Sequence, residues 1–502
     1  MEQERKLGQI LLKKINSEKL IASLVLWVIL ISSSYFFNSY QISWLIVISI
    51  GIIATILIYL VQIKVPVLAS LIIILLGSFY VVVNSILDTP DEIAHLGRAY
   101  YVSEGNFSME EDYSDIFVSE DFEIINEDIY KNFSETNLAD YKHSNDKVNA
   151  PQLSATNTNL FISYLPQAVG LFIGRILNLN LFSTFLLGRF LNLIAYALLV
   201  KKALEMANKW QTPLAFIACM PMMLFLAASY NPDAISMGLT FITLALFIKL
   251  TQKEDIQKKD LIIYTLLCSL LSTIKLPYVA LIGLLFFLKP KNYTRKKFFS
   301  FSVVCLSLTG IISIIWLLSY LNVAPVHRPD GVDAIAQLEN LLSSFKLMFK
   351  VIISTVFMNI NRYKMLFSFG WLSYESIEIA FLHLFTFGAI CVSYPLKIKL
   401  SKLNKLGLVI IAIAISILIN LSQYLTWTPV GTEFVQGVQG RYFIGVYAMF
   451  PLFLNQQGSL YTIDSINASG LKKYNRIILY LIIYFIILMF SLMLGNALSL
   501  ET

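Results

Sequence analysis

The sequence predicts an all-α membrane protein that crosses the bilayer about thirteen times. Hydrophobic residues make up 57% of its 502 residues, whereas charged residues make up only 14%. A soluble protein of this length would carry roughly 25% charged residues. The apolar residues occur in runs of roughly 15–24, which suits bilayer-spanning helices, and the short loops rich in Lys all fall on one side. Composition, run length and loop charge therefore agree on a polytopic helical protein.

The first three apolar runs lead to the most polar part of the chain. They cover Leu20–Phe37, Ile42–Val61 and Val65–Leu87, and the basic residues before them place the N-terminus in the cytoplasm. The third run therefore ends outside. Between Asp88 and Lys147 the chain then holds 16 Asp or Glu against 4 Lys or Arg, which is half of its 32 acids. This composition predicts a large acidic outer loop built of short helices and loops.

The next apolar run, 160–177, is interrupted by Pro166, Gly170, Gly174 and Arg175. We interpret it as a helix lying in the outer interface, because a crossing there would put the lysines at 201, 202 and 209 outside. With this assignment the remaining runs cross the membrane alternately inward and outward, and the lysine-rich loops between them all lie on the cytoplasmic side. They are Leu181–Val200, Leu214–Ser229, Ala234–Leu250, Leu261–Thr273, Val279–Leu288, Phe298–Leu321, Ile377–Tyr394, Leu406–Leu425, Tyr442–Leu454 and a last run ending near Leu500.

The loops divide the chain into five parts. Two outer segments separate three groups of spans, and an amphipathic stretch near Ile335–Phe349 lies in the second outer segment. The parts are 1–87 (N-terminal spans), 88–180 (large acidic outer loop with interfacial helices), 181–321 (central bundle), 322–376 (second outer region) and 377–502 (C-terminal spans).

Polar residues from distant parts of the chain meet on the predicted outer face. Charged groups cost several kcal/mol in hydrocarbon, so at this depth they usually face water, a partner or a substrate. Cations there suit a phosphate, and a carboxylate suits the deprotonation of a hydroxyl. The candidates are Asp91, Glu92, His95, Arg98, Arg189, Asn231, Asp233, Lys275, Tyr278, Arg362, Lys364, Trp371, Glu433, Gln436, Gln439 and Arg441.

These candidates also have structural interpretations. Asp91 and Glu92 could simply be the first polar residues after a helix that Pro90 stops. Arg189 and Arg441 start their helices at headgroup level, so they could extend to lipid phosphate. The sequence alone leaves both interpretations open.

The same holds for the remaining charged and aromatic candidates. Asp233 could cap the following helix, and Trp371 belongs at an interface in either case. His95 could be a satisfied interface histidine, and with no second histidine nearby the sequence does not predict a zinc site. Lys275 lies in an apolar hairpin beside Pro277, which favours burial against a partner group.

Several common functional motifs are missing from the sequence. It contains no phosphate-binding glycine loop, nucleophile elbow or dinucleotide fingerprint. Its 4 cysteines stand far apart inside apolar runs, which is typical of core residues rather than of disulfides or metal ligands.

Short motifs spread over most of the chain resemble a known family. In this order they look like a bacterial integral-membrane family known only as a domain of unknown function, which is similar to the GT-C glycosyltransferases. That superfamily includes protein mannosyltransferases and the aminoarabinose transferase of lipid A. The motifs are Pro90-Asp91-Glu92 with His95, Tyr164-Leu165-Pro166, Gly188-Arg189, Ser229 with Asp233, Lys275-Leu276-Pro277-Tyr278, Phe369-Gly370-Trp371-Leu372 and Gly440-Arg441-Tyr442-Phe443.

The resemblance implies a GT-C-like fold and an enzyme that uses a polyprenyl-phosphate-linked sugar at the outer leaflet. Asp91 or Glu92 would act as the base or orient the acceptor, and Lys275 and Arg441 would hold the lipid phosphate, with Arg189 as a further candidate. Some GT-C relatives bind a divalent cation at the acidic motif and others do not, so a metal stays open here. The remaining candidates for acceptor or sugar contacts are His95, Arg98, Asp233, Tyr278, Trp371 and Gln439.

We therefore predict an inverting glycosyltransferase that moves a sugar from a polyprenyl-phosphate donor to a cell-envelope glycan, lipid or protein. It would be a multi-pass protein of a bacterial cell membrane with its site outside, in contact with lipid and not with nucleic acid. Two alternatives are a polymerase or ligase of lipid-linked surface polysaccharide and a transporter or flippase of lipid-linked glycans.

Overall fold

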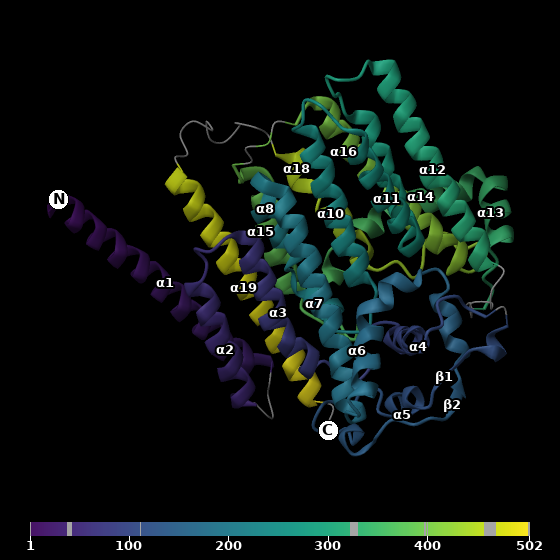
Figure 1. The fold of residues 1–502 in the computed structure, drawn as a ribbon, viewed down its shortest axis with the longest axis horizontal. Helices are drawn as coiled ribbons and strands as arrows, with labels where there is room; N and C mark the ends of the chain where they lie inside the picture. Colours follow the sequence, from purple (N-terminus) through teal and green to yellow (C-terminus); the bar gives the residue numbers. More distant parts are fainter. Residues whose placement is uncertain are drawn as a thin grey trace.

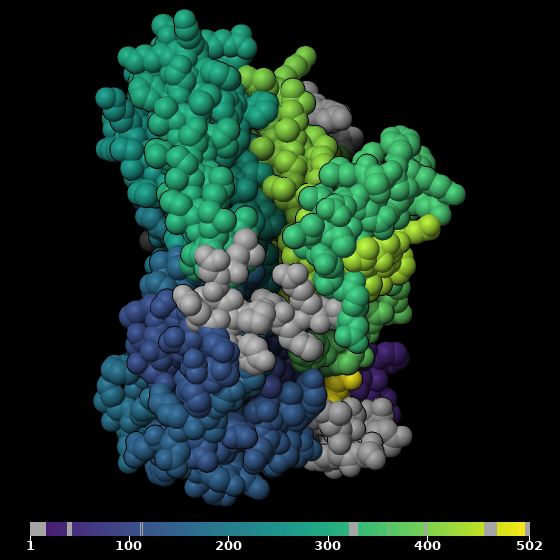
Figure 2. All heavy atoms as spheres, turned by 90° about the vertical axis from the view of Figure 1, so that its right-hand side faces the viewer, coloured from purple at the N-terminus to yellow at the C-terminus, as the bar shows by residue number. Residues whose placement is uncertain are grey.

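The protein is a bundle of helices with a small mixed subdomain at one end (Figure 1). The computed structural model describes residues 2–37, 43–110, 112–321, 330–395, 398, 400–455 and 468–499. In Figure 1 the subdomain with α4, α5 and the strands β1 and β2 lies at the lower end of the bundle. The same segment gathers at the lower end of the face in Figure 2, with α12 above it.

Within the described residues, seven helices are long and apolar enough to cross a membrane. Each coincides with a predicted crossing, so the predicted multi-helix membrane architecture is confirmed at this level. The helices are α1 (Glu2–Phe37), α3 (Val65–Val83), α7 continuing into α8 (Leu181–Ala207 and Gln211–Ala218), α10 (Asp233–Thr251), α12 (Arg295–Leu321), α16 (Lys402–Thr426) and α19 (Ala468–Ser499).

The other predicted crossings fall on helices that are shorter or interrupted. A helix needs about twenty residues to cross the hydrocarbon core unaided, so apolar composition alone overstates their length. These elements are α2 (Trp44–Tyr59), α9 (Pro221–Ala227), α11 (Lys258–Ile274), η6 (Leu276–Phe287), α15 (Ile377–Ser393), η8 (Gly440–Phe443), α17 (Ile444–Tyr447) and α18 (Phe450–Leu454).

Proline accounts for two of these differences. The predicted crossing at 214–229 is divided, because α8 ends at Ala218 and α9 begins at Pro221, which has no N–H to continue the preceding helix. The predicted crossing at 279–288 belongs to η6, a 3₁₀ helix that starts at Leu276 and Pro277. At about 2 Å rise per residue, a 3₁₀ helix covers more distance than an α-helix of equal length.

The apolar run at 160–177 forms η4 (Phe161–Tyr164) and α6 (Leu165–Ile176). After a short turn, the chain continues into α7, whose first turns pack back along α6. A Cβ atom on Gly170 would lie 2.6 Å from the Cα of Gly188, and one on Gly174 would lie 2.5 Å from Thr184. Small residues thus allow close contact between the two helices. The predicted interfacial helix is therefore one arm of a helical hairpin with α7.

The acidic segment, predicted to lie outside, contains the expected short helices and also a two-stranded antiparallel sheet. The sheet pairs Phe117 with Asn149 and Ser119 with Lys147, and Phe122 and Leu153 pack on Gly97 of α4. The elements of this subdomain are α4 (Glu92–Ser103), η1 (Tyr113–Asp115), β1 (Phe117–Ser119), α5 (Asp121–Glu127), η2 (Leu138–Asp140), β2 (Lys147–Asn149) and η3 (Pro151–Thr156).

In the described part of the second predicted outer region, two helices take the place of the single amphipathic stretch expected near Ile335–Phe349. The axes of α13 (Ala334–Ser343) and α14 (Phe345–Asn361) differ by 107° at a break beside Ser344. The Asp333 side chain caps α13 and the Ser344 side chain caps α14. After η7 (Lys364–Phe367), the strands β3 (Ser368–Phe369) and β4 (Tyr374–Glu375) form a tight hairpin.

The close contact between α6 and α7 predicts a strong size limit at Gly170. We expect Gly170→Val to lower the free energy of unfolding by about 1–3 kcal/mol, the usual cost of overpacking, because the new Cβ meets backbone atoms of Gly188. Thermal unfolding in detergent measures the effect. The control is Gly310→Val on α12, where an added Cβ meets open space; equal losses for the two variants would contradict the proposed cause.

Candidate functional site

The site is organised by the start of α4. The loop after α3 reaches Asp91, whose φ of 64° lies in the left-handed region, a conformation that Asp tolerates better than most residues. The helix then begins at Glu92, and the His95 N–H donates to the Asp91 carbonyl at 3.2 Å. The backbone reversal at Asp91 separates the environments of the two adjacent carboxylates.

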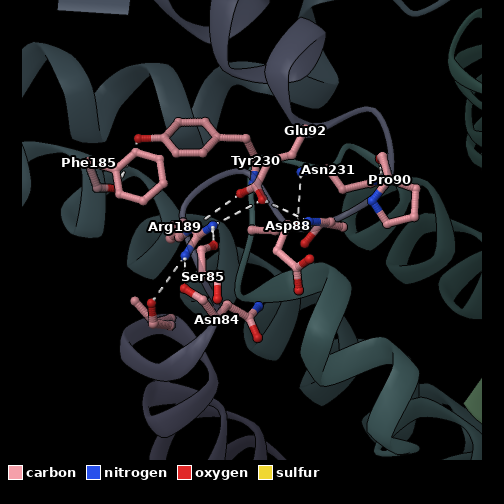
Figure 3. A network of polar contacts seen from close by, with 12 residues as sticks. Asn84, Ser85, Asp88, Pro90, Glu92, Phe185, Arg189, Tyr230 and Asn231 are labelled. Atoms are coloured by element: carbon pink, nitrogen blue, oxygen red, sulfur yellow. Dashed lines mark hydrogen bonds and ion pairs between the residues drawn. The ribbon is translucent and has the colours of Figure 1, made fainter. Parts of the chain in front are cut away.

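Glu92 forms a fully buried, two-pronged ion pair with Arg189 of α7 (Figure 3). The Arg189 Nε donates to Glu92 Oε1 at 3.0 Å, and Nη2 donates to Oε2 at 3.0 Å. Both side chains are 0% exposed. The Arg189 guanidinium also lies over the Phe185 ring at 4.4 Å. The pair therefore lies inside the protein, away from lipid headgroups.

Backbone groups complete the bonding of this pair. The N–H groups of Thr89 and Tyr230 donate to the two oxygens of Glu92 at 3.2 and 3.0 Å. Arg189 donates to the carbonyls of Asn84 and Ser85, each at 2.9 Å. A longer bond from Arg189 to the Val81 carbonyl, at 3.5 Å, engages its fifth N–H. Both predicted site residues are thus bonded to the protein itself, which leaves Glu92 no free oxygen and Arg189 no free N–H.

A second cluster, Asp91, Asp233, Lys275 and Arg441, joins four segments that are distant in sequence. Arg441 Nη2 donates to Asp91 Oδ2 at 3.2 Å, and its Nε lies 3.5 Å from Asp233 Oδ2. Lys275 donates to the other oxygen of Asp233. Two carboxylates and two cations therefore alternate in one chain of ion pairs, which we call the charge cluster.

Exposure differs sharply within the charge cluster. The Asp91 side chain is 48% exposed, whereas that of Arg441 is 5% exposed and those of Asp233 and Lys275 are largely buried. The ring of Tyr442 lies beside both cations, at 4.9 Å from Lys275 and 5.5 Å from Arg441. Asp91 is thus the member of the cluster that a ligand can reach most easily.

Arg441 keeps unused bonding capacity. Its Nη1 is buried and, like the Oε1 of Gln439, has no hydrogen-bond partner among the described residues. Both residues line a small pocket next to the charge cluster. The pocket is bounded by Pro90, Met222, Phe225, Leu226, Met365, Ser368, Leu372, Gln439 and Arg441.

The other predicted site residues lie around the cluster or apart from it. Tyr278 supports the segment that carries Arg441, because its hydroxyl donates to the Tyr442 carbonyl at 2.8 Å. Trp371 is exposed at the turn of the β3–β4 hairpin. Arg98 instead points into the subdomain that holds β1 and β2, where it donates to the Phe107 carbonyl at 3.3 Å.

Sequence reasoning missed two polar contacts near the site. Tyr164 binds His95 Nδ1 through its hydroxyl at 2.9 Å. Tyr374 of β4 donates to Asp88 at 3.1 Å, which ties the β3–β4 hairpin to the loop before α4. Burial raises the pKa of Asp88 to about 6. Tyr164 stands in one of the quoted motifs, whereas nothing in the sequence linked Tyr374 to Asp88.

Metal ligands do not gather at the acidic motif within the described part of the chain. No group of three or more His, Cys, Asp or Glu side chains there is arranged to hold a metal ion. The four cysteines are free, and all but Cys305 are buried, as expected for core residues.

Fold and site together define a helical protein with several candidate membrane spans, a buried ion pair and a charge cluster. The sequence model of a family described as "Predicted membrane protein (DUF2142)" matches residues 74–450. The chain therefore belongs to this family of unknown function, and the matched region includes every residue of the charge cluster. No curated protein and no solved structure matches the chain.

The buried ion pair predicts a strong effect on stability. We expect Arg189→Met to lower the free energy of unfolding by roughly 3–5 kcal/mol, because it strands the Glu92 carboxylate in the interior. Asp91→Asn, at the exposed neighbouring carboxylate, is the control and should change stability far less. Thermal unfolding of purified protein measures both; an Arg189→Met variant as stable as wild type would contradict the structural role.

The raised pKa of Asp88 predicts a pH-dependent stability. Because its folded pKa of about 6 exceeds the ordinary value of 3.8, the folded state favours the protonated acid. The contribution of Asp88 to the free energy of unfolding is therefore complete below about pH 4 and is lost as pH rises through about 6. We expect Asp88→Asn to gain stability relative to wild type between pH 4.5 and 7.5, by about 1–3 kcal/mol. A constant difference across this range in thermal unfolding would refute the assignment.

Proposed function

We propose that this protein is a glycosyltransferase that moves a sugar from a polyprenyl-phosphate-linked donor to a cell-envelope acceptor at the outer face of the membrane. The observation that carries the proposal is the charge cluster. It places one accessible carboxylate, Asp91, in direct contact with a buried arginine, Arg441, and Asp233 links that arginine to a lysine, Lys275. Transfer from a phosphate-linked donor needs both a proton acceptor and cations for the departing phosphate.

Asp91 is the better of the two predicted bases. One of its oxygens contacts Arg441, and the side chain is half exposed, so a hydroxyl can approach it. Glu92 is fully buried and has both oxygens bonded. In the proposed reaction Asp91 takes the proton of the acceptor hydroxyl, while that oxygen attacks the anomeric carbon and the bond to the donor phosphate breaks. A single displacement of this kind inverts the anomeric centre.

Arg441 and Lys275 are the proposed contacts of the donor phosphate. Both cations already neutralise Asp233, so the cluster carries no large excess charge before a ligand arrives. The unpaired Nη1 of Arg441 can donate to a phosphate oxygen without breaking the contacts to Asp91 and Asp233. Charge-assisted hydrogen bonds of this type are roughly twice as strong as neutral ones.

The proposed outer location rests on the distribution of lysines and arginines. The N-terminal ends of α12 and α16, which begin at Arg295 and Lys402, lie toward the upper end of Figure 1, opposite the acidic subdomain. Positive charge favours the cytoplasmic side of a membrane. The subdomain and the charge cluster beside it would then face outward, where lipid-linked sugars meet cell-envelope acceptors.

The proposal predicts a large loss of transfer in Asp91→Asn. Purified protein in lipid nanodiscs is incubated with radiolabelled polyprenyl-phosphate sugars and membrane acceptors, and product is counted after extraction. We expect Asp91→Asn to reduce the transfer rate about 100-fold or more, as loss of a general base does. Asp140→Asn, at an exposed acid of the same subdomain, is the control and should keep the wild-type rate.

Two other outcomes would decide against this function. Donor binding without transfer, equal in wild type and Asp91→Asn, would favour a transporter of lipid-linked glycans. A change in polysaccharide chain length rather than the gain of one sugar would favour a polymerase or ligase.

A further inference from the structure

His95 lies beside Asp91 but has a different environment. It occupies α4 one turn after Asp91 and is largely buried. Its charged neighbours come from four segments: Asp91, Asp233, Lys275 and Arg441. Two of these groups are acids and two are cations, so they impose little net preference on the charge of the imidazole.

The hydrogen bonds around Tyr164 fix the position of the His95 proton. The Asn159 amide donates to the Tyr164 hydroxyl oxygen at 3.2 Å. The Tyr164 hydroxyl is buried, and His95 Nδ1 at 2.9 Å is the acceptor available for its own hydrogen among the described residues, so the hydroxyl donates to that nitrogen. Nδ1 is then the acceptor, and the single proton of a neutral imidazole resides on Nε2.

Burial keeps the imidazole neutral. The pKa of His95 falls from 6.5 to about 4, because burial disfavours the charged form and Arg441 and Lys275 oppose a further positive charge, although Asp91 and Asp233 act in the other direction. His95 thus presents an Nε2–H at physiological pH. This group makes no hydrogen bond with the protein in the part of the chain that the structure describes.

We infer that His95 is a neutral hydrogen-bond donor of fixed tautomer, held by Tyr164 and Asn159, which binds a hydroxyl oxygen of the substrate next to Asp91. A hydroxyl suits this position, because its uncharged oxygen can accept a hydrogen bond from His95 without disturbing the balance of two acids and two cations around it. A sugar with neighbouring hydroxyls can accept from His95 and donate to Asp91 at once. The identity of the ligand as a sugar rests on the proposed function, whereas the tautomer does not.

The tautomer is tested by ¹⁵N NMR of the full-length protein in nanodiscs, with histidine labelled in the ring. The chain has 4 histidines, and the spectrum of His95→Gln assigns the signal of His95. We expect an Nε2–H imidazole that stays neutral down to about pH 5. In Tyr164→Phe we expect both tautomers and protonation closer to the ordinary pKa. A proton on Nδ1, or a wild-type pKa near 6.5, would overturn the inference whether or not the protein transfers sugar.

The contact with substrate is tested by two amide substitutions. A Gln side chain can place its N–H near the position of Nε2, whereas the shorter Asn reaches only the position of Nδ1. We expect His95→Gln to keep the acceptor KM within about threefold of wild type and His95→Asn to raise it about tenfold or more, the range expected for one hydrogen bond. Equal KM values for the two variants would exclude a donor role. A wild type without transfer would instead count against the proposed function and leave the NMR result to decide the tautomer.

Discussion

The buried pair of Glu92 and Arg189 is the interaction on which the site depends. It joins the first turn of α4 to the third turn of the long helix α7, with both side chains out of contact with solvent. Two desolvated charges are expensive unless each is fully bonded. Here the backbone of the loop after α3 and the N–H of Tyr230 supply the missing bonds. Three segments of chain are therefore fixed by one pair.

That pair reaches the charge cluster through short connections. Asp91 directly precedes Glu92, so anchoring Glu92 sets where Asp91 can lie. On the other side, Asn192 of α7 donates to the carbonyls of Ser229 and Asn231, and Asn231 in turn accepts from the Asp233 N–H at 2.8 Å. Both carboxylates of the charge cluster are thus positioned from α7. This arrangement explains how adjacent acids in the sequence serve different purposes, one as an anchor and the other as a reachable group.

The sequence indicates which residues come together in the site, but it does not indicate which of them form ion pairs with each other. Asp91, Asp233, Lys275 and Arg441 were assigned to one face because each stands at the end of an apolar run, and the structure brings them into contact. The pairing of Glu92 with Arg189 depends on the left-handed backbone at Asp91 and on how deeply α7 is buried among the other helices. The sequence around these residues indicates neither feature. Hydropathy likewise located the helices but not their breaks, since an apolar run such as 214–229 reads the same whether or not it contains Pro221.

Charge balance in the cluster explains the need for a neutral histidine. Asp91 and Asp233 already match Arg441 and Lys275, so a protonated imidazole at position 95 would add an uncompensated charge in a largely buried place. Neutral His95 offers a directed N–H without that cost, provided that its tautomer is fixed. The hydroxyl of Tyr164 supplies this constraint from η4, just before the α6–α7 hairpin. Because η4 leads directly into α6, the close contact between α6 and α7 at Gly170 also helps to hold Tyr164, and through it His95, in place.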